Sequence, residues 1–90
     1  GEGYGAYLGT VPDFSPVEYG VKISGVRDGA PADVAGLQAG DIIIRFDDEE
    51  IKDLQGMTNA LRKRKPGETV KITVVREGRE LVMSAVFGKR

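Results

Sequence analysis

Residues 31–41 of the chain read PADVAGLQAGD, and they place a helix start, a helix end and a tight turn directly before an apolar run. Pro31 suits the first helical position because its missing N–H breaks no helical hydrogen bond. Gly36 suits the left-handed residue that follows a helix, and Gly40 and Asp41 then turn the chain. The segment therefore predicts a short helix over 31–35 that leads into a strand.

The composition limits the class of protein. The chain has 90 residues, 40% hydrophobic and 30% charged, which suits one small globular domain. Its 13 Lys and Arg residues nearly balance 14 Asp and Glu residues, which argues against a nucleic-acid partner or a membrane surface. The longest aliphatic run, Ile42-Ile43-Ile44, is far shorter than the roughly 20 residues that cross a bilayer. We therefore expect no membrane insertion by this chain.

The residue types that catalysis and metal binding need are largely missing. The chain contains no histidine and no cysteine, which removes the commonest general base, the commonest metal ligand and every disulfide. The acidic run 47–50 lacks the glycine-containing loop of a calcium site, so we expect a solvated turn. The basic run 62–65 falls at a predicted helix end, where cations offset the helix dipole. We predict no catalytic residues, no metal site and no cofactor.

Hydrophobic alternation predicts strands along most of the chain. We expect them over residues 7–14, 20–26, 41–46, 70–74 and 81–87. Pro12 disturbs the end of the first strand, because proline cannot donate to a strand ladder. In the third strand, Ile42, Ile44 and Phe46 are expected to share one face, with Ile43 on the other.

Turn and capping residues separate these strands. Glu77-Gly78 predicts a two-residue hairpin turn, and Asp53 predicts the N-cap of a helix over 54–64. With mostly antiparallel strands and two helices, the pattern predicts a small α+β domain that is mainly β.

The PAxxAGLxxGD pattern of residues 31–41 resembles the signature of PDZ domains, particularly those attached to bacterial proteases. The resemblance covers nearly the whole chain. It implies a partly open antiparallel β-barrel of five to six strands capped by two helices. It also implies a single domain over 7–88, with a flexible lead over 1–6 and a tail over 89–90.

The resemblance extends to the family's peptide groove. Tyr7-Leu8-Gly9-Thr10 is similar to the YLGI/GLGF loop, which implies that the amides of Leu8, Gly9 and Thr10 receive a terminal carboxylate. The edge that would pair with a peptide then runs from Thr10 through Val11 and Pro12 to Phe14. Groove residues implied on the helix are Leu54, Thr58 and Leu61, whereas Met57 is expected to face the core. Without the resemblance, Leu8, Leu54 and Leu61 would be interpreted as ordinary core residues, which is the usual role of leucine at such positions.

Four positions depart from the family pattern. Thr10 replaces an apolar residue, and Pro12 removes an N–H that would meet the peptide two residues before its end. No lysine or arginine precedes the loop, so a carboxylate would rely on backbone dipoles and solvent. Leu54 replaces the histidine of many relatives that select serine or threonine, which predicts a preference for an apolar peptide residue there.

The resemblance implies a non-catalytic module of a larger protein, in which the module binds a protein C-terminus or an extended internal segment for a protease domain. The glycine-containing N-terminal lead and the VPDF segment, residues 11–14, most resemble PDZ modules that follow zinc aminopeptidase domains; a serine protease is the other possible parent. The family implies a bacterial cell envelope or periplasm. Two alternatives stay open: a structural domain with an occluded groove that packs on its parent or on a second copy, and a module that contributes substrate contacts to an active site.

Overall fold

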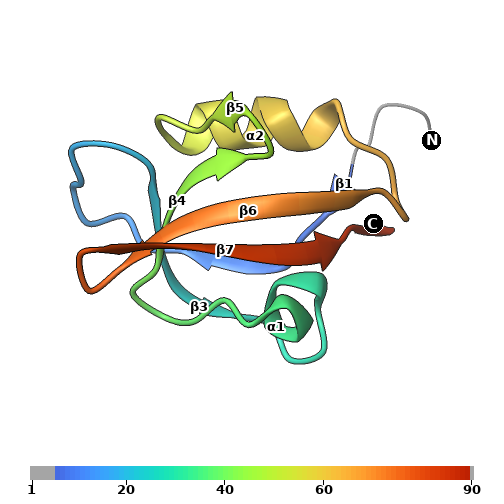
Figure 1. Ribbon diagram of the computed structural model, residues 1–90, viewed down its shortest axis with the longest axis horizontal. Coiled ribbons are helices and arrows are strands. Elements are labelled where there is room, and N and C mark those ends of the chain that lie inside the picture. Colours follow the sequence, from blue (N-terminus) through green and yellow to red (C-terminus); the bar gives the residue numbers. More distant parts are fainter. Residues whose placement is uncertain (1–5, 90) are drawn as a thin grey trace.

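The C-terminal hairpin is the longest strand pair of the computed structural model, which describes residues 6–89 (Figure 1). β6 (Thr69–Arg76) and β7 (Arg79–Val86) pair antiparallel along their whole length. Glu77 and Gly78 form the turn with φ angles of 53° and 79°, as a tight hairpin turn requires. The predicted hairpin is confirmed.

The remaining strands extend this hairpin into a larger sheet. They are β1 (Ala6–Tyr7), β2 (Thr10–Pro12), β3 (Val21–Val26), β4 (Ile42–Phe46), β5 (Glu49–Glu50) and β8 (Gly88–Lys89). The main sheet has the order β2-β3-β4-β6-β7, with β5 beside β4, and β1 pairs with β8 in a separate sheet. All pairs are antiparallel, and the sheets are not closed into a barrel. The mainly β, PDZ-like fold is confirmed. Residues 6–89 form eight strands rather than five or six, because the two-residue strands leave no periodic pattern in the sequence.

The first predicted strand is divided into two. β1 ends at Tyr7 and β2 begins at Thr10, so the prediction of one strand over 7–14 is wrong. Gly9 has a φ of 83°, which turns the chain between the two strands. Ala6 and Lys89, which the sequence placed in the lead and the tail, pair with each other across β1 and β8. Residues 1–5 of the predicted lead lie outside the described residues.

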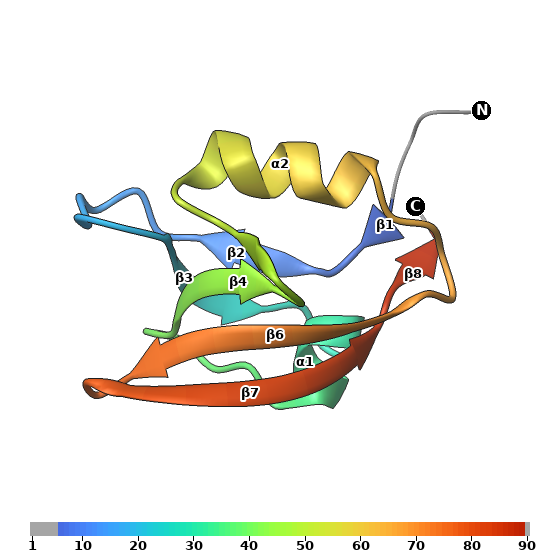
Figure 2. The same ribbon diagram turned by 45° about the horizontal axis from the view of Figure 1, so that its top comes forward.

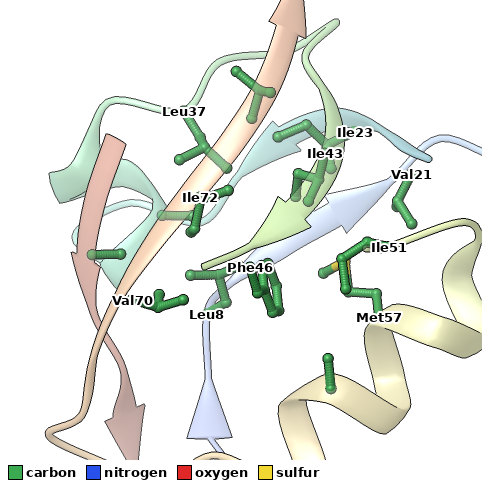
Figure 3. Close-up of a cluster of buried hydrophobic side chains, with 14 of the residues drawn as sticks. Leu8, Val21, Ile23, Leu37, Ile43, Phe46, Ile51, Met57, Val70 and Ile72 are labelled. Atoms are coloured by element: carbon green, nitrogen blue, oxygen red, sulfur yellow. The ribbon is translucent and has the colours of Figure 1, made fainter. Parts of the chain in front are cut away.

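The core lies between the main sheet, α2 and the β1–β2 link. Ile43 and Phe46 are fully buried in β4, whereas Ile42 and Ile44 are half-buried. The predicted common face of Ile42, Ile44 and Phe46 is therefore wrong. An irregularity in the pairing with β6, between Ile43 and Arg45, breaks the two-residue alternation. Figure 3 shows Ile43 and Phe46 directed into the core cluster, where the ring of Phe46 meets that of Phe87 edge-on at 6.1 Å.

Both helices begin where the sequence predicts. α1 (Pro31–Ala35) has Pro31 at its first turn and ends at Gly36, whose φ is 99°. α2 (Leu54–Arg62) is capped by Asp53, whose Oδ1 accepts the N–H of Gly56 at 2.8 Å. It ends two residues earlier than predicted. α1 packs against β7, and α2 lies along β2 and runs in the opposite direction (Figure 2). Neither of these helices is long and apolar enough to cross a membrane.

A buried ion pair fixes the segment that follows α1. The side chain of Asp41 is 1% exposed, and its two oxygens accept Nε and Nη2 of Arg76, each at 2.8 Å. Asp41 also accepts the N–H of Gln38 at 2.9 Å, and Arg76 donates to the carbonyl of Gly36 at 3.0 Å. The charges and donors of this cluster are therefore paired within the protein, and they join the loop after α1 to the end of β6.

We expect Arg76→Leu to lower the free energy of unfolding more than Asp41→Asn does. The first variant leaves a buried carboxylate without its cation, and breaking a buried pair in this way costs about 3–5 kcal/mol. The second leaves an arginine whose side chain is 26% exposed and can turn towards water. Urea unfolding followed by circular dichroism measures both. Equal losses, or the reverse order, would contradict the role given to burial.

Candidate functional site

A groove of about 310 Å³ lies between α2 and the segment of β1 and β2. α2 runs opposite to β2, so its C-terminal end reaches the β1–β2 link and its N-terminal end lies beside the end of β2 (Figure 2). The groove is lined by Tyr7, Leu8, Gly9, Thr10, Pro12, Leu54, Met57, Thr58, Leu61 and Arg62. The loop, the strand edge and the helix that the sequence assigned to one site are thus adjacent in space.

Eight of the nine site residues predicted from the sequence line this groove, and Val11 does not. Val11 is 37% exposed, and because side chains alternate along a strand it lies on the other face of β2 from Thr10 and Pro12. Met57 lines the groove although the sequence placed it in the core; it is only 3% exposed, so it belongs to both. Its position four residues before Leu61 could have indicated this. Arg62 was interpreted only as a helix-end cation.

The lining residues differ in depth. Leu8 is 2% exposed and belongs to the core cluster, so it forms part of the floor. Leu54 is 38% exposed at the rim, and Leu61 is half-buried. The hydroxyl of Thr58 donates to the carbonyl of Leu54 at 3.0 Å, which occupies its donor within the helix. Leu8 is therefore both a core residue and a groove residue, while Leu54 is not a core residue.

The backbone of the β1–β2 link has its carbonyls occupied and its N–H groups available. The carbonyl of Leu8 accepts the N–H of Ala32, and the carbonyl of Gly9 accepts the N–H of Arg27, each at 2.9 Å. Within residues 6–89, the N–H groups of Leu8 and Gly9 donate to no acceptor. Successive free N–H groups at the end of an apolar groove form the kind of concavity that binds an anion.

The outer edge of β2 faces the groove. The carbonyl of Gly9 and the N–H of Asp13 are both bonded towards β3, the latter to the carbonyl of Lys22 at 2.8 Å. In an antiparallel pair these directions alternate, so the backbone groups of Thr10 and Pro12 point away from β3. β2 is also the end strand of its sheet. The edge offers the N–H and carbonyl of Thr10, and only a carbonyl at Pro12.

Ion pairs beyond the end of α2 hold this helix over the sheet. Arg64 Nη1 lies 2.7 Å from Asp47, and Lys63 Nζ lies 2.5 Å from Glu49. Hydrogen bonds from Arg64, and then from the N–H of Lys71, hold the pKa of the Asp47 carboxyl below its usual value of 3.8. The acidic run, predicted as a solvated turn, and the basic run, predicted as helix-end cations, therefore bind each other. No group of three His, Cys, Asp or Glu residues in the described part of the chain is placed to hold a metal ion.

Residues 7–85 match the family of the PDZ domain. The chain belongs to the PDZ domain family. This confirms the resemblance inferred from residues 31–41 and from the loop at residues 7–10. A PDZ domain is not itself a catalytic domain, and the predicted absence of catalytic residues agrees with that assignment.

Related PDZ-containing proteins include bacterial serine proteases. A probable periplasmic serine endoprotease DegP-like from Chlamydia muridarum is 39% identical over 61 residues, which are 68% of this chain and 12% of that protein. The serine protease Do-like HtrA of Bacillus subtilis is 41% identical over 68 residues, or 74% of this chain and 15% of that protein. A structure of the HtrA-type protease AlgW with a decapeptide has a TM-score of 0.85 at 26% identity, covering 96% of this chain and 30% of that one. The chain therefore spans only a small part of these relatives.

We expect Asp47→Asn to flatten the loss of stability in acid. The folded state lowers the pKa of Asp47, so the unfolded chain takes up this proton first as the pH falls. The contribution of Asp47 is therefore present above about pH 4 and is lost as the pH falls through its lower folded pKa. Urea unfolding of both proteins between about pH 5 and pH 2 measures this difference. Asp48→Asn, in the same exposed turn, is the matched control. Parallel pH curves for wild type and Asp47→Asn would contradict the assignment.

We expect Gly9→Ala to destabilise the domain more than Gly29→Ala. Both glycines have positive φ angles, 83° and 73°, so both variants acquire backbone strain of about 1–3 kcal/mol. A Cβ at Gly9 would also overlap with the Cβ of Ala30, whereas a Cβ at Gly29 meets nothing within 4 Å. The difference between their unfolding free energies isolates the overlap. Equal losses of unfolding free energy in the two variants would contradict this, because they would show that the β1–β2 link can move away from Ala30 without loss of stability.

Proposed function

We propose that this PDZ domain binds one extended peptide segment as an added strand on β2, within the groove formed with α2, and that it does so for a protease domain of the same protein. The observation that carries the proposal is the free backbone of the groove. The N–H groups of Leu8 and Gly9 and the outer groups of Thr10 are bonded to none of residues 6–89, and they lie beside a largely apolar helix face. Strand addition uses such backbone groups for affinity and side-chain pockets for selectivity.

The orientation of the peptide follows from the position of the anion site. A terminal carboxylate at the N–H groups of Leu8 and Gly9 makes the peptide antiparallel to β2, with its last side chain between Leu8 and Leu61. Its third residue from the end then lies near Pro12 and Leu54. Because both positions are apolar, the groove favours apolar residues there. The solved AlgW protease, with a TM-score of 0.85 to this chain, was determined with a decapeptide, and this supports a peptide ligand.

The proposed interaction is weak. Pro12 offers no N–H to the peptide, and one lost hydrogen bond costs about 0.5–1.5 kcal/mol. The anion site has backbone donors but no cation preceding it in the described part of the chain. We expect dissociation constants of roughly tens to hundreds of micromolar, which correspond to about −5 to −6.5 kcal/mol. Such a module suits recruitment of segments to a neighbouring catalytic domain rather than permanent assembly.

The parent protein is proposed to be an HtrA-type serine protease of the bacterial envelope or periplasm. This proposal is supported by the serine proteases that match this chain at 39% and 41% identity, one of which is described as periplasmic. A zinc aminopeptidase parent, which the lead and residues 11–14 favoured, stays a prediction. The competing function is a packing domain whose groove takes no peptide, and Pro12 within the pairing edge is the observation that favours it.

We expect peptides with an apolar C-terminus to shift the amide resonances of residues 8–14 and 54–61 saturably. The experiment titrates a pool of acetylated pentapeptides ending in valine, leucine or phenylalanine into ¹⁵N-labelled protein. Shifts at Leu8, Gly9 and Thr10 report the anion site. The amidated twins of the same peptides test the carboxylate, because amidation removes its charge and leaves the side chains.

A groove variant and a distant variant complete the design. Thr58→Arg fills the groove and is expected to abolish the shifts. Val82→Ala alters a side chain that is 62% exposed on β7, at the opposite edge of the sheet, and is expected to leave them unchanged. Shifts that survive amidation would indicate an internal segment as the ligand. Absence of shifts at millimolar peptide would reject peptide binding and favour the packing domain.

A further inference from the structure

Among the described residues that line the groove, Arg62 carries the one charged side chain. It is the last residue of α2, and its side chain is exposed. α2 contacts β1, and Figure 2 shows its C-terminal end beside the β1–β2 link. Arg62 is therefore at the end of the groove where the N–H groups of Leu8 and Gly9 lie, which donate to no acceptor within residues 6–89.

The next two cations, Lys63 and Arg64, are engaged in ion pairs, whereas Arg62 pairs with none of residues 6–89. Lys63 is paired with Glu49, and Arg64 is paired with Asp47, Glu49 and Glu68. Arg62 makes no ion pair or side-chain hydrogen bond with any of residues 6–89. Neither Lys63 nor Arg64 lines the groove. In the basic run 62–65, Arg62 and Lys65 make no ion pair with any of residues 6–89, and of these two it is Arg62 that lines the groove.

The helix dipole makes a cation useful at this place. The C-terminal end of a helix carries a partial negative charge, which would repel a carboxylate bound beside it. A cation in the last turn offsets that charge, and Arg62 is the basic residue of the last turn of α2. The backbone donors of Leu8 and Gly9 hold an anion by orientation, but they add no net charge. Arg62 supplies the positive charge that the β1–β2 link lacks.

We infer that Arg62 is the electrostatic partner of the ligand's terminal carboxylate and makes the groove selective for free C-termini over internal segments. This inference rests on the proposed function, because it assigns a residue to the anion end of the same groove. In this arrangement Arg62, on the α2 wall of the groove, takes the role of the cation that is missing before the loop. The groove would then prefer a chain end that carries a free carboxylate beside an apolar last residue.

The test combines three variants with two forms of one peptide. The protein variants are Arg62→Gln, Arg62→Lys and the control Lys63→Gln, which removes a charge one residue away that is already paired with Glu49. The probe is the pentapeptide from the pool that binds wild type most tightly, with a free C-terminus and as its amide. Dissociation constants are measured by amide-shift titration at about 20 mM and about 1 M salt.

We expect Arg62→Gln to lower the affinity for the free-acid peptide about fivefold at low salt, which is the scale of one exposed charge pair. The affinity for the amidated peptide should be unchanged. Arg62→Lys should retain most of the affinity, and Lys63→Gln all of it. At high salt the effect of Arg62→Gln should nearly vanish, because the Debye length falls to about 3 Å. Unshifted amide resonances away from the site confirm that each variant is folded.

Three results would overturn the inference. Unchanged affinity of Arg62→Gln for the free acid would show that backbone donors alone hold the carboxylate. An equal loss for acid and amide would mean that Arg62 contacts another part of the peptide. If wild type binds the free-acid and amidated peptides with equal affinity, the carboxylate is not recognised, although the groove still binds peptides. If no peptide binds wild type, the proposed function fails, and the assignment of Arg62 fails with it.

Discussion

The buried pair of Asp41 and Arg76 is the constraint on which the groove depends. It ties the turn after α1 to the end of β6, and Arg76 also holds the carbonyl of Gly36 at the end of α1. α1 in turn supports the β1–β2 link from behind. The N–H of Ala32 donates to the carbonyl of Leu8. Ala30, the residue directly before α1, lies so close to Gly9 that it leaves no room for a side chain there. The segment 31–41 that identifies the fold thus also positions the β1–β2 link at one end of the groove.

The other wall of the groove is positioned by polar contacts at both ends of α2. Asp53 caps the first turn, and Arg64 and Lys63 bind the acidic turn between β4 and β5 just beyond the last turn. Between these ends, Met57 and Ala60 are buried against the core. The helix is therefore fixed to the core by its buried residues and, just beyond its C-terminal end, to the acidic run by ion pairs. A groove held in this way is preorganised, so a peptide does not have to order the helix when it binds.

Local signals in the sequence predicted local structure correctly. Pro31, Asp53 and the pair Glu77-Gly78 act within four residues of themselves, and each element they predicted is present. Misjudged features depended on distant partners. The alternation of β4 is broken by its pairing with β6, which the apolar pattern of residues 42–46 cannot reveal. β1 finds its partner at the other end of the chain, in β8.

The same division holds for the groove. The loop and strand residues were predicted from the resemblance to the family's carboxylate-binding loop, and the helix residues from that resemblance together with their spacing of four and three. Eight of these nine residues line one cavity. Arg62 was overlooked because a run of four basic residues gives no sign of which charges are paired. Only the folded chain brings Asp47 and Glu49 to Arg64 and Lys63, and so distinguishes them from Arg62.

Pro12 has a further consequence for the open edge of the sheet. An unpaired sheet edge is a template for aggregation, since any extended chain can continue the ladder. β2 is only three residues long, carries a proline, and lies opposite an irregularity in its pairing with β3. A strand added there finds its donors concentrated at the end near Gly9 and none at Pro12. The edge can therefore accept one short guest while resisting the growth of a continuous intermolecular sheet.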